Sequence, residues 1–403
     1  MADVSIVHSP TINTIAQIDR LGARNYDPIP VVIASASGAW VKDIEGKSYL
    51  DMLSAYSALN HGHRHPRIIE TLKRQADKLT LTSRAFHHDV MLGFYERVSR
   101  WTNKNKILPM NTGAEAVETA IKAARRWGYR VKGIPDDQAE IIVCAQNFHG
   151  RTITITSFST NPVSRAHFGP FTPGFRVVPY GDLNALEEAI HDRTAAFLVE
   201  PIQGEAGVII PPDGYIKQAR EICRKHQVLF IADEIQTGLC RTGRRFACDW
   251  EQVEPDLYII GKALGGGVIP ISAVAGDEEV MDLFDPGSHG STFGGNPLAC
   301  AVASTALDVL EEEQLDKQAE RKGKRFLEFL KQLQSPVVKA VRGRGLLLAV
   351  DLTVPARPFC EKLMQNGILC KETHEHTIRF APPLIIEEQD LEWAMQRIQE
   401  TLK

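Results

Sequence analysis

The sequence predicts an α/β protein with a large domain, built on a mostly parallel sheet, and a smaller α+β domain. Two observations lead to this fold class. First, short apolar runs alternate with amphipathic stretches through the middle of the chain. That alternation is typical of parallel strands whose connecting helices cover both faces of one sheet. Second, the pattern changes after about residue 300, where charged helices and short strands follow one another.

The expected strands of the large domain are six short apolar runs. They span residues 141–144, 153–157, 197–200, 228–233, 257–260 and 271–275. Amphipathic stretches that predict helices lie between several of them, at 114–131, 184–190 and 215–226. Thr112 and Glu115 have capping-box spacing at the start of the first helix, so its first turn offers free N–H groups. Loop 160–175 shows no secondary-structure pattern, and loops of that length are often functional.

After about residue 300, the chain is expected to form a smaller α+β domain, with two helices leading into it. The predicted order is helices 298–312 and 315–333, strand 345–352, helix 359–366, strands 368–371 and 377–380, and helix 388–402. Near the other end, runs 40–44 and 49–52 flank Glu45-Gly46, which is a hairpin signal. We expect this hairpin to pack with the C-terminal domain. The predicted division is therefore an N-terminal segment (1–55), a large domain (56–312) and a small domain (313–403).

The composition argues against several classes of protein. The chain has 46 Lys and Arg against 50 Asp and Glu, so it lacks the basic excess of a nucleic-acid-binding protein. No apolar run approaches the ~18 residues of a membrane span, and the first residues show no secretory signal pattern. The seven cysteines are scattered and never in C-x-x-C spacing, which argues against a disulfide framework or a zinc ribbon. We expect a cytoplasmic protein without a membrane or nucleic-acid partner.

Polar residues at the ends of two expected strands indicate a chemistry. Asp233 ends one run, and Gly261-Lys262 ends the next one along the chain, shortly before three consecutive glycines. Ligands of open α/β sheets bind at the carboxyl ends of the strands. A lysine and an aspartate are the pair that a pyridoxal phosphate enzyme needs. The lysine attaches the cofactor, and the aspartate keeps its ring nitrogen protonated.

Simpler interpretations of the same residues remain open at this point. An aspartate at a strand end more often caps the following loop, and a Gly-Lys pair is usually on the surface. A Walker phosphate loop is excluded, because Asp256 stands where its first glycine is required and Ala263 follows the lysine. Two segments have the small and hydroxyl residues of a phosphate cradle, 111–115 and 289–297, although the first is more often just a capped helix.

Three alternating histidines, His61, His63 and His65, suggest a metal site. They lie in an expected loop beside Arg64 and Pro66, with no acidic residue nearby in the sequence. We therefore expect no metal ion in this protein.

Taken together, four phrases resemble the class III, or ω-amino acid, aminotransferases. They are residues 112–116, 230–238, 261–264 and 289–297, in the order of the family. The resemblance covers essentially the whole chain. It implies fold type I of the enzymes that use pyridoxal 5′-phosphate, the fold of aspartate aminotransferase. Further phrases are similar to the branch of the class that acts on ornithine: 25–31, 54–58, 79–86, 147–152, 200–207 and 378–384. His149 departs from that branch, where related enzymes often carry an aromatic residue.

The resemblance implies a role for each residue around the cofactor ring. Lys262 is implied to attach the cofactor and then to move the proton between substrate and cofactor carbons. Asp233 is implied to pair with the ring nitrogen, and Gln236 to lie near the phenolic oxygen. Phe148 stacks on one face of the ring in this interpretation, and Ile235 covers the other.

The resemblance also implies how the phosphate is held. Gly113 and Ala114 are implied to offer backbone N–H groups to it. Ser291 and Thr292 are implied to reach the phosphate of the neighbouring subunit. We therefore expect a homodimer, or a larger assembly, with shared active sites.

Five residues are implied to bind the two substrates, L-ornithine and 2-oxoglutarate. The carboxylates of these substrates lie at two distances from the reacting carbon, so two arginines are needed. Arg151 resembles the arginine that binds the carboxylate far from the reacting carbon. Arg379 resembles the arginine that binds the carboxylate next to that carbon. Glu205 resembles the residue that pairs with this near arginine, here Arg379, and controls which substrates reach it. Tyr26 and Tyr56 resemble the residues that line the binding site of the diamine donor and form a hydrogen bond with it.

The expected reaction transfers the δ-amino group of L-ornithine to 2-oxoglutarate, giving L-glutamate 5-semialdehyde and L-glutamate. Acetylornithine and 4-aminobutyrate aminotransferases are the alternatives within the class, and Tyr26 discriminates them because a free α-amine needs a polar contact. Fold type I also contains decarboxylases and aminomutases. Arg151, Glu205 and Arg379 together favour a transaminase with two substrates. A scaffold without enzymatic activity is the third alternative, and it requires that Lys262 hold no cofactor.

Overall fold

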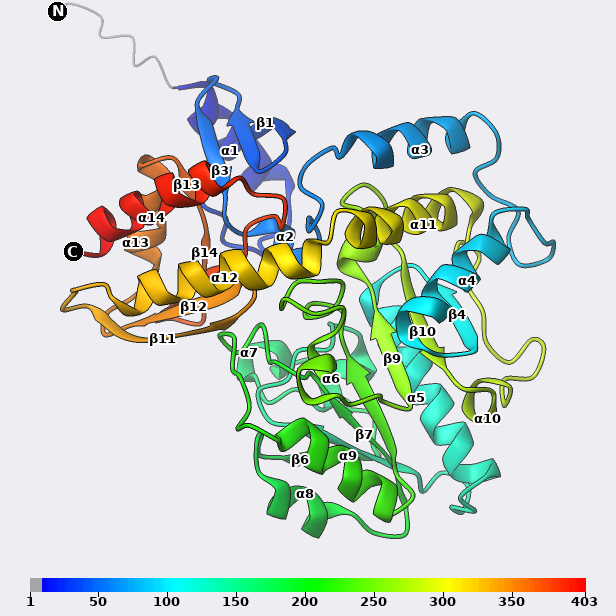
Figure 1. The fold of residues 1–403 in the computed structure, drawn as a ribbon. Helices are drawn as coiled ribbons and strands as arrows, with labels where there is room; N and C mark the ends of the chain where they lie inside the picture. The colour runs from blue at the N-terminus through cyan, green and yellow to red at the C-terminus, as the bar shows by residue number, and fades with distance from the viewer. Residues whose placement is uncertain (1–8) are drawn as a thin grey trace, which may run out of the picture.

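The computed structural model describes residues 9–403, which form three β-sheets with helices packed around them (Figure 1). The largest sheet has seven strands in the order β4-β10-β9-β8-β7-β5-β6. Neighbours from β9 to β6 are parallel, whereas β10 runs antiparallel to β4 and β9. This confirms the mostly parallel sheet. Its strands are β4 (Lys106–Met110), β5 (Glu140–Cys144), β6 (Phe175–Val178), β7 (Thr194–Val199), β8 (Leu229–Asp233), β9 (Leu257–Ile260) and β10 (Ser272–Gly276).

Alternate residues of this sheet face two separate hydrophobic cores. In β5, Ile141 and Val143 lie in the core that helix α5 (Gly113–Arg130) covers. Ile142 and Cys144 lie in the other core, which α8 (Leu183–Ala189) and α9 (Tyr215–Lys225) cover. Because both faces are covered, β7 and β8 are buried at every position and are nearly uninterrupted apolar runs. The carboxyl ends of the strands are therefore where polar residues such as Asp233 gather.

Two four-stranded sheets contain the remaining strands. One has the order β11-β12-β15-β14, and the other, β1-β2-β3-β13, joins strands from both ends of the chain. Their strands are β1 (Ile33–Ser37), β2 (Trp40–Asp43), β3 (Ser48–Asp51), β11 (Val338–Arg344), β12 (Leu347–Leu352), β13 (Ile368–Leu369), β14 (Lys371–Thr373) and β15 (Thr377–Phe380). Leu50 of β3 pairs in parallel with Ile368 of β13. The hairpin expected near Glu45-Gly46 is confirmed as β2–β3.

Aromatic contacts also join the two ends of the chain. The rings of Trp40 and Trp393 lie 5.3 Å apart, and Trp40 Nε1 donates to Asp390 Oδ2 at 3.0 Å. Figure 1 shows the blue N-terminal strands beside the orange and red C-terminal elements. The division of the chain after residues 55 and 312 stays a prediction.

The helices around the C-terminal sheet agree with those expected from the sequence. They are α12 (Leu315–Lys331), α13 (Arg357–Gln365) and α14 (Glu388–Leu402). The other helices are α1 (Pro10–Leu21), α2 (Ser54–Ser57), α3 (Pro66–Ala76), α4 (Met91–Thr102), α6 (Ile153–Ser157), α7 (Pro162–Arg165), α10 (Glu278–Met281) and α11 (Pro297–Glu312), with 3-10 turns at Ala247–Glu251 and Lys262–Gly265. None of the helices within residues 9–403 combines the length and apolar character that crossing a bilayer requires.

Two predicted strands were wrong. Residues 153–157 form helix α6, because Thr152 accepts a hydrogen bond from the Ile155 N–H and starts a helical turn. Local capping overrides the strand preference of these β-branched residues. Residues 368–371, predicted as one strand, divide into β13 and β14, which belong to different sheets.

The three alternating histidines have separate partners. His63 Nε2 lies 2.8 Å from Asp51 Oδ2, and His65 Nε2 lies 3.1 Å from Glu313 Oε1. His61 Nε2 lies 2.9 Å from a main-chain carbonyl. The expectation that this run has no acidic partner nearby was wrong, because the fold brings Asp51, 12 residues from His63, and the distant Glu313 against it. Among the described residues, no His, Cys, Asp and Glu side chains gather into a group that would hold a metal ion.

Candidate active site

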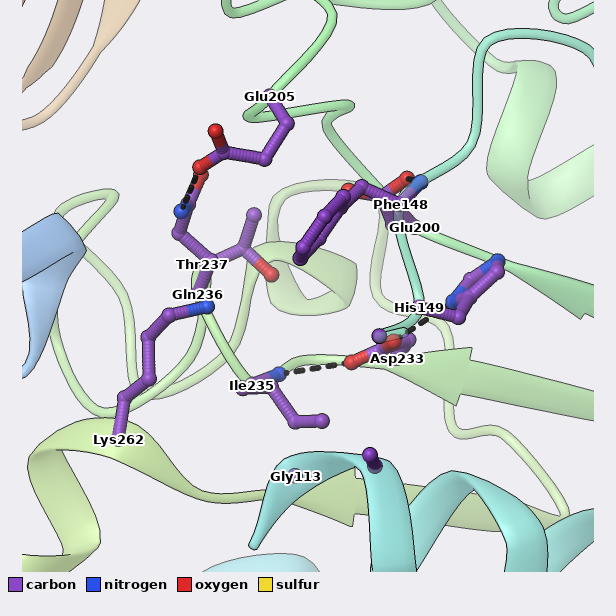
Figure 2. A pocket seen from close by; sticks show the side chains of 12 residues that line it. Gly113, Phe148, His149, Glu200, Glu205, Asp233, Ile235, Gln236, Thr237 and Lys262 are labelled. Atoms are coloured by element: carbon purple, nitrogen blue, oxygen red, sulfur yellow. Dashed lines mark hydrogen bonds and ion pairs between the residues drawn. The ribbon is translucent and has the colours of Figure 1, made fainter. Parts of the chain in front are cut away.

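A cavity of about 210 Å³ lies at the carboxyl ends of β8 and β9, above the start of α5 (Figure 2). It brings together most of the residues predicted to surround a cofactor. The predicted residues that line it are Gly113, Ala114, Phe148, Glu205, Asp233, Ile235, Gln236 and Lys262. They come from strand ends and loops that lie far apart in the sequence, so the fold rather than local sequence assembles the cavity.

Lys262 lies just after the end of β9, separated from it by Gly261. Its backbone has a φ of +44°, an uncommon conformation for a residue with a side chain, and such residues cluster at functional sites. Figure 2 shows its side chain extending into the cavity. Burial lowers the pKa of the Lys262 ammonium, although the charges of Glu205 and Asp233 oppose that shift. A lowered pKa increases the neutral fraction, and the neutral amine is the form that acts as nucleophile or base.

Asp233 ends β8 and is held by two hydrogen bonds. Its Oδ1 accepts from the Ile235 N–H at 3.1 Å, and its Oδ2 lies 2.7 Å from His149 Nδ1. Only 4% of Asp233 is exposed. Burial disfavours a charged His149, but the hydrogen bond and charge of Asp233 outweigh that effect and raise the pKa of His149. The pair keeps a carboxylate at the floor of the cavity.

His149 and Glu200 line the cavity although sequence reasoning gave neither a role. Glu200 follows β7, and its Oε2 accepts from the Phe148 N–H at 2.9 Å. Burial raises the pKa of Glu200 to about 7. The departure of His149 from the family pattern was the available signal. Its contact with Asp233 was not predictable, because 84 residues separate them.

The start of α5 forms a cradle for an anion. Thr112 Oγ1 accepts from the Glu115 N–H at 3.2 Å, and Glu115 Oε2 accepts from the Thr112 N–H at 2.7 Å, so the predicted capping box is confirmed. Gly113 and Ala114 are the first two residues of the helix, and N–H groups at that place have no partner within the helix. A Cβ at Gly113 would come within 3.0 Å of Ile235 Cδ1, so the glycine leaves space between the helix start and Ile235.

Arg379 and Glu205 form the predicted ion pair. Arg379 Nη1 donates to Glu205 Oε1 at 2.6 Å, and Gln236 Nε2 donates to the same oxygen at 2.9 Å. Only 2% of Arg379 is exposed. Burial disfavours the Glu205 carboxylate, but the charge of Arg379 outweighs it and lowers the pKa of Glu205. The Glu205 side chain is 28% exposed, so the ion pair joins a buried arginine to a partly exposed carboxylate.

A second cavity, of about 530 Å³, shares Phe148 and Glu205 with the first. Arg151 lines it, and its guanidinium carbon lies 5.4 Å from the centre of the Phe148 ring. Tyr56 lines it as well, with its ring centre 5.1 Å from the Arg379 guanidinium. The two predicted arginines thus lie in one cavity.

Tyr56 is positioned by an unusual stretch of backbone. The four residues of α2 have φ values between +46° and +72°, although none of them is glycine. Asp51 Oδ1 accepts from the N–H groups of Leu53 and Ser54 at 2.9 and 2.8 Å, which holds the entry to this left-handed turn. Left-handed backbone costs roughly 1–2 kcal/mol per residue, so no local pattern predicts it.

Three predicted residues lie outside both cavities. Tyr26 is 68% exposed and lines neither of them. Ser291 Oγ accepts from Asn111 Nδ2 at 2.8 Å, just before the cradle of α5, and Thr292 is exposed. The roles expected of these residues stay predictions.

Comparison with known proteins identifies the family. Residues 21–402 match the model of the class III aminotransferases. The chain belongs to the class III aminotransferases. Pyridoxal 5′-phosphate is the cofactor of this class, and the fold is fold type I.

Individual relatives of this aminotransferase are similar over their whole length. The ornithine aminotransferase of Brevibacillus brevis is 62% identical, over 98% of this chain and 99% of its own. That of Bacillus subtilis is 60% identical, over 96% and 97%. A solved ornithine aminotransferase of Toxoplasma gondii, described with partial occupancy of PLP at its active site, superposes with a TM-score of 0.96 at 49% identity, over 97% and 94%. An acetylornithine aminotransferase of Elizabethkingia anophelis superposes with a TM-score of 0.90 at 46% identity, over 98% of this chain and 99% of its own.

The residues of this aminotransferase fit the cofactor of its class. The open cradle at Gly113 suits a phosphate, and the buried carboxylate of Asp233 suits a cationic ring nitrogen. Lys262, the lysine that lines the same cavity, suits attachment of an aldehyde. Three independent features therefore match the phosphate, the ring and the reactive carbon.

Replacing Gly204 by alanine is expected to damage the cofactor cavity of this aminotransferase. The new methyl group would lie 1.5 Å from Gln236 Oε1, so the amide must leave its place and lose its bond to Glu205. We expect turnover to fall at least about tenfold, which corresponds to ~1.4 kcal/mol. Steady-state kinetics and cofactor retention after dialysis measure the effect. Gly93→Ala is the matched control, because its methyl group meets only the flexible end of Arg97 at 3.2 Å. Equal behaviour of the two variants would contradict the prediction.

Proposed function

We propose that this protein is an ornithine aminotransferase. It transfers the δ-amino group of L-ornithine to 2-oxoglutarate and forms L-glutamate 5-semialdehyde and L-glutamate. The observation that carries this proposal is the Arg379–Glu205 ion pair at 2.6 Å, in a cavity that also contains Arg151. Curated relatives named ornithine aminotransferase, at about 60% identity over nearly the full chain, support the same conclusion.

The cofactor supplies an electron sink that stabilises negative charge at the carbon losing its proton. The protein supplies the groups that hold and move that proton. Lys262 accepts it at Nζ and returns it, and its lowered pKa keeps enough neutral amine for this task. Asp233 holds a proton on the ring nitrogen, and His149 fixes the orientation of the carboxylate through its 2.7 Å contact. Phe148 and Ile235 exclude water from the ring faces.

The two arginines match the carboxylates of the two substrates. Arg379 lines the outer cavity and pairs with Glu205, which lines both cavities, so Arg379 suits a carboxylate beside the reacting carbon. Arg151 lines the outer cavity, so it suits the distant carboxylate of ornithine or of 2-oxoglutarate. Glu205 neutralises Arg379 while ornithine, which has no carboxylate beside its δ-carbon, is bound. When 2-oxoglutarate enters, its carboxylate displaces Glu205 from Arg379.

We infer that the active protein is a homodimer, or a larger assembly, with shared sites. Phe86 and Phe293 are 72% and 55% exposed, and large exposed apolar side chains mark interaction surfaces. Both lie in the phrases that resemble the family, and Thr292 is adjacent to the second. We further propose that the protein is cytoplasmic and that the chain divides into an N-terminal segment (1–55), a large domain (56–312) and a small domain (313–403).

Replacing Tyr26 by phenylalanine is expected to weaken the use of L-ornithine more than that of 4-aminobutyrate. In this proposal the Tyr26 hydroxyl contacts the α-ammonium group, which 4-aminobutyrate lacks. An ammonium without its partner costs about 1–3 kcal/mol. The ratio of kcat/KM values for the two donors measures the effect. Equal losses for both donors would show that Tyr26 is only a wall of the site.

A panel of amino donors with 2-oxoglutarate tests the proposed function. We expect L-ornithine to give the highest kcat/KM, with the semialdehyde detected as its cyclised form. N-acetylornithine is the main competing donor, since a solved acetylornithine aminotransferase is 46% identical to this chain. A preference for N-acetylornithine or 4-aminobutyrate would overturn the proposal in favour of that activity.

A further inference from the structure

Glu372 contributes a carboxylate to the outer cavity that no role described so far uses. It lies on β14 and lines the cavity together with Arg151, Tyr56 and Arg379. Its side chain is 16% exposed. A carboxylate so enclosed is costly unless hydrogen bonds or cations satisfy both of its oxygens.

Only one of the two Glu372 oxygens is satisfied by residues 9–403. Oε1 accepts from Lys371 Nζ and, at 3.2 Å, from Arg357 Nη1. Oε2 is buried and has no hydrogen-bond partner within that part of the chain. Burial opposes ionisation of Glu372, but these hydrogen bonds outweigh it and lower its pKa, so the group is charged at neutral pH. The side chain therefore keeps capacity to accept one more donor.

The ion-pair cluster that contains Glu372 has a net negative charge, while Arg151 and Arg379 line the same cavity. Arg357 and Lys371 are the cations of the cluster, while Asp27, Glu361 and Glu372 are its carboxylates, so the five groups keep one net negative charge. Arg357 also donates to the carbonyls of Asp27 and Pro28 at 2.9 and 2.6 Å. It thereby ties Glu372 to the segment that follows Tyr26.

We propose that Glu372 binds the α-ammonium group of the amino donor and selects donors in which that amine is free. This inference rests on the proposed function and deepens it. L-Ornithine carries its carboxylate and its α-ammonium group on one carbon, at the end remote from the reacting amine. With the carboxylate on Arg151, the adjacent ammonium lies in the cavity that Glu372 lines. An N-acetylated amine brings no charge to offset the desolvated carboxylate, so such donors are disfavoured.

Glu372→Gln tests this proposal with two donors that differ in one group. L-Ornithine and 5-aminopentanoate share the reacting amine and the carboxylate, but only ornithine has the α-ammonium group. We expect kcat/KM for ornithine to fall about tenfold to a hundredfold, as for a lost hydrogen bond between charged groups. For 5-aminopentanoate we expect a change of less than about twofold. Both values come from one protein sample, so any unfolded fraction cancels in their ratio.

Two further variants separate recognition from structure. Glu375→Gln removes a carboxylate that is 75% exposed on the turn between β14 and β15, and it should leave the donor ratio unchanged. Glu372→Asp keeps the charge and should restore part of the preference for ornithine. An unchanged donor ratio in Glu372→Gln, or equal losses for both donors, overturns the role of Glu372 while ornithine turnover by the wild type still supports the proposed function. A wild-type protein that does not use ornithine overturns both.

Discussion

The Lys262→Ala protein is expected to have no measurable aminotransferase activity. In the proposed function Lys262 accepts and returns the proton, and a positioned acid–base group contributes roughly a factor of 10²–10⁴ to a rate. The proposal also has this side chain attach the cofactor, so its loss should slow the transfer of the cofactor from the enzyme to the substrate amine. We expect the combined loss to exceed about a thousandfold. Single-turnover kinetics with L-ornithine measures it directly.

The cofactor should still bind to Lys262→Ala. The cradle of α5 and the Asp233–His149 pair remain in place, and neither depends on the lysine. The absorption spectrum should therefore show bound cofactor without covalent attachment. Lys262→Arg is the matched control, because it restores the charge and bulk of the side chain while remaining unable to attach an aldehyde or act as a base near neutral pH. Full activity in either well-folded variant would contradict the assignment of Lys262.

Glu205→Ala is expected to change the balance between the two half-reactions. Without Glu205, Arg379 is free to attract any carboxylate beside the reacting carbon. Glutamate then no longer has to displace a carboxylate, so its half-reaction should become about tenfold faster, equivalent to ~1.4 kcal/mol. Removing one partner of a buried ion pair can cost ~3–5 kcal/mol. We expect a smaller effect on this half-reaction, because the substrate carboxylate takes the place of Glu205 beside Arg379.

The same change should harm the use of ornithine. A free Arg379 attracts the α-carboxylate of ornithine and brings its α-amine, instead of its δ-amine, to the reacting position. We therefore expect slower δ-transfer and some α-transfer. Single-turnover kinetics of each half-reaction, with identification of the ornithine product, provides the measurement. Glu205→Gln keeps the shape and removes the charge, so it should resemble the alanine variant. A half-reaction ratio equal to that of the wild type would show that Glu205 is not a gate.

The residues at strand ends explain why much of this site was predictable. Asp233 and Lys262 come at the ends of apolar runs, and strands covered on both faces of a sheet are such runs. The capping box at Thr112 is likewise local information. These signals predicted that Asp233, Lys262 and the start of α5 lie around one cavity. Arg379 and Glu205 form the ion pair that the family resemblance implied.

Features that depend on distant contacts or on strained backbone were not predictable. The contact of His149 with Asp233 joins the loop after β5 to the end of β8. The left-handed turn that carries Tyr56 contradicts the preferences of its own residues and persists because Asp51 and the surrounding core hold it. Residues 153–157 have strand-like composition, but a threonine cap makes them helical. In each case tertiary structure decides what the local sequence leaves open.

The pairing of β3 with β13 has a consequence for the synthesis of the chain. Leu50 N donates to the carbonyl of Gly367 at 2.8 Å, and Met52 N donates to that of Leu369 at 2.8 Å. At about 5–20 residues per second, a ribosome needs roughly 15–60 s to make the residues between Leu50 and Ile368. Throughout that time one edge of the nascent hairpin has no partner strand, and bare edges invite pairing with other chains. A product that terminates before residue 368 would keep this edge exposed, which would make it a target for chaperones and proteases.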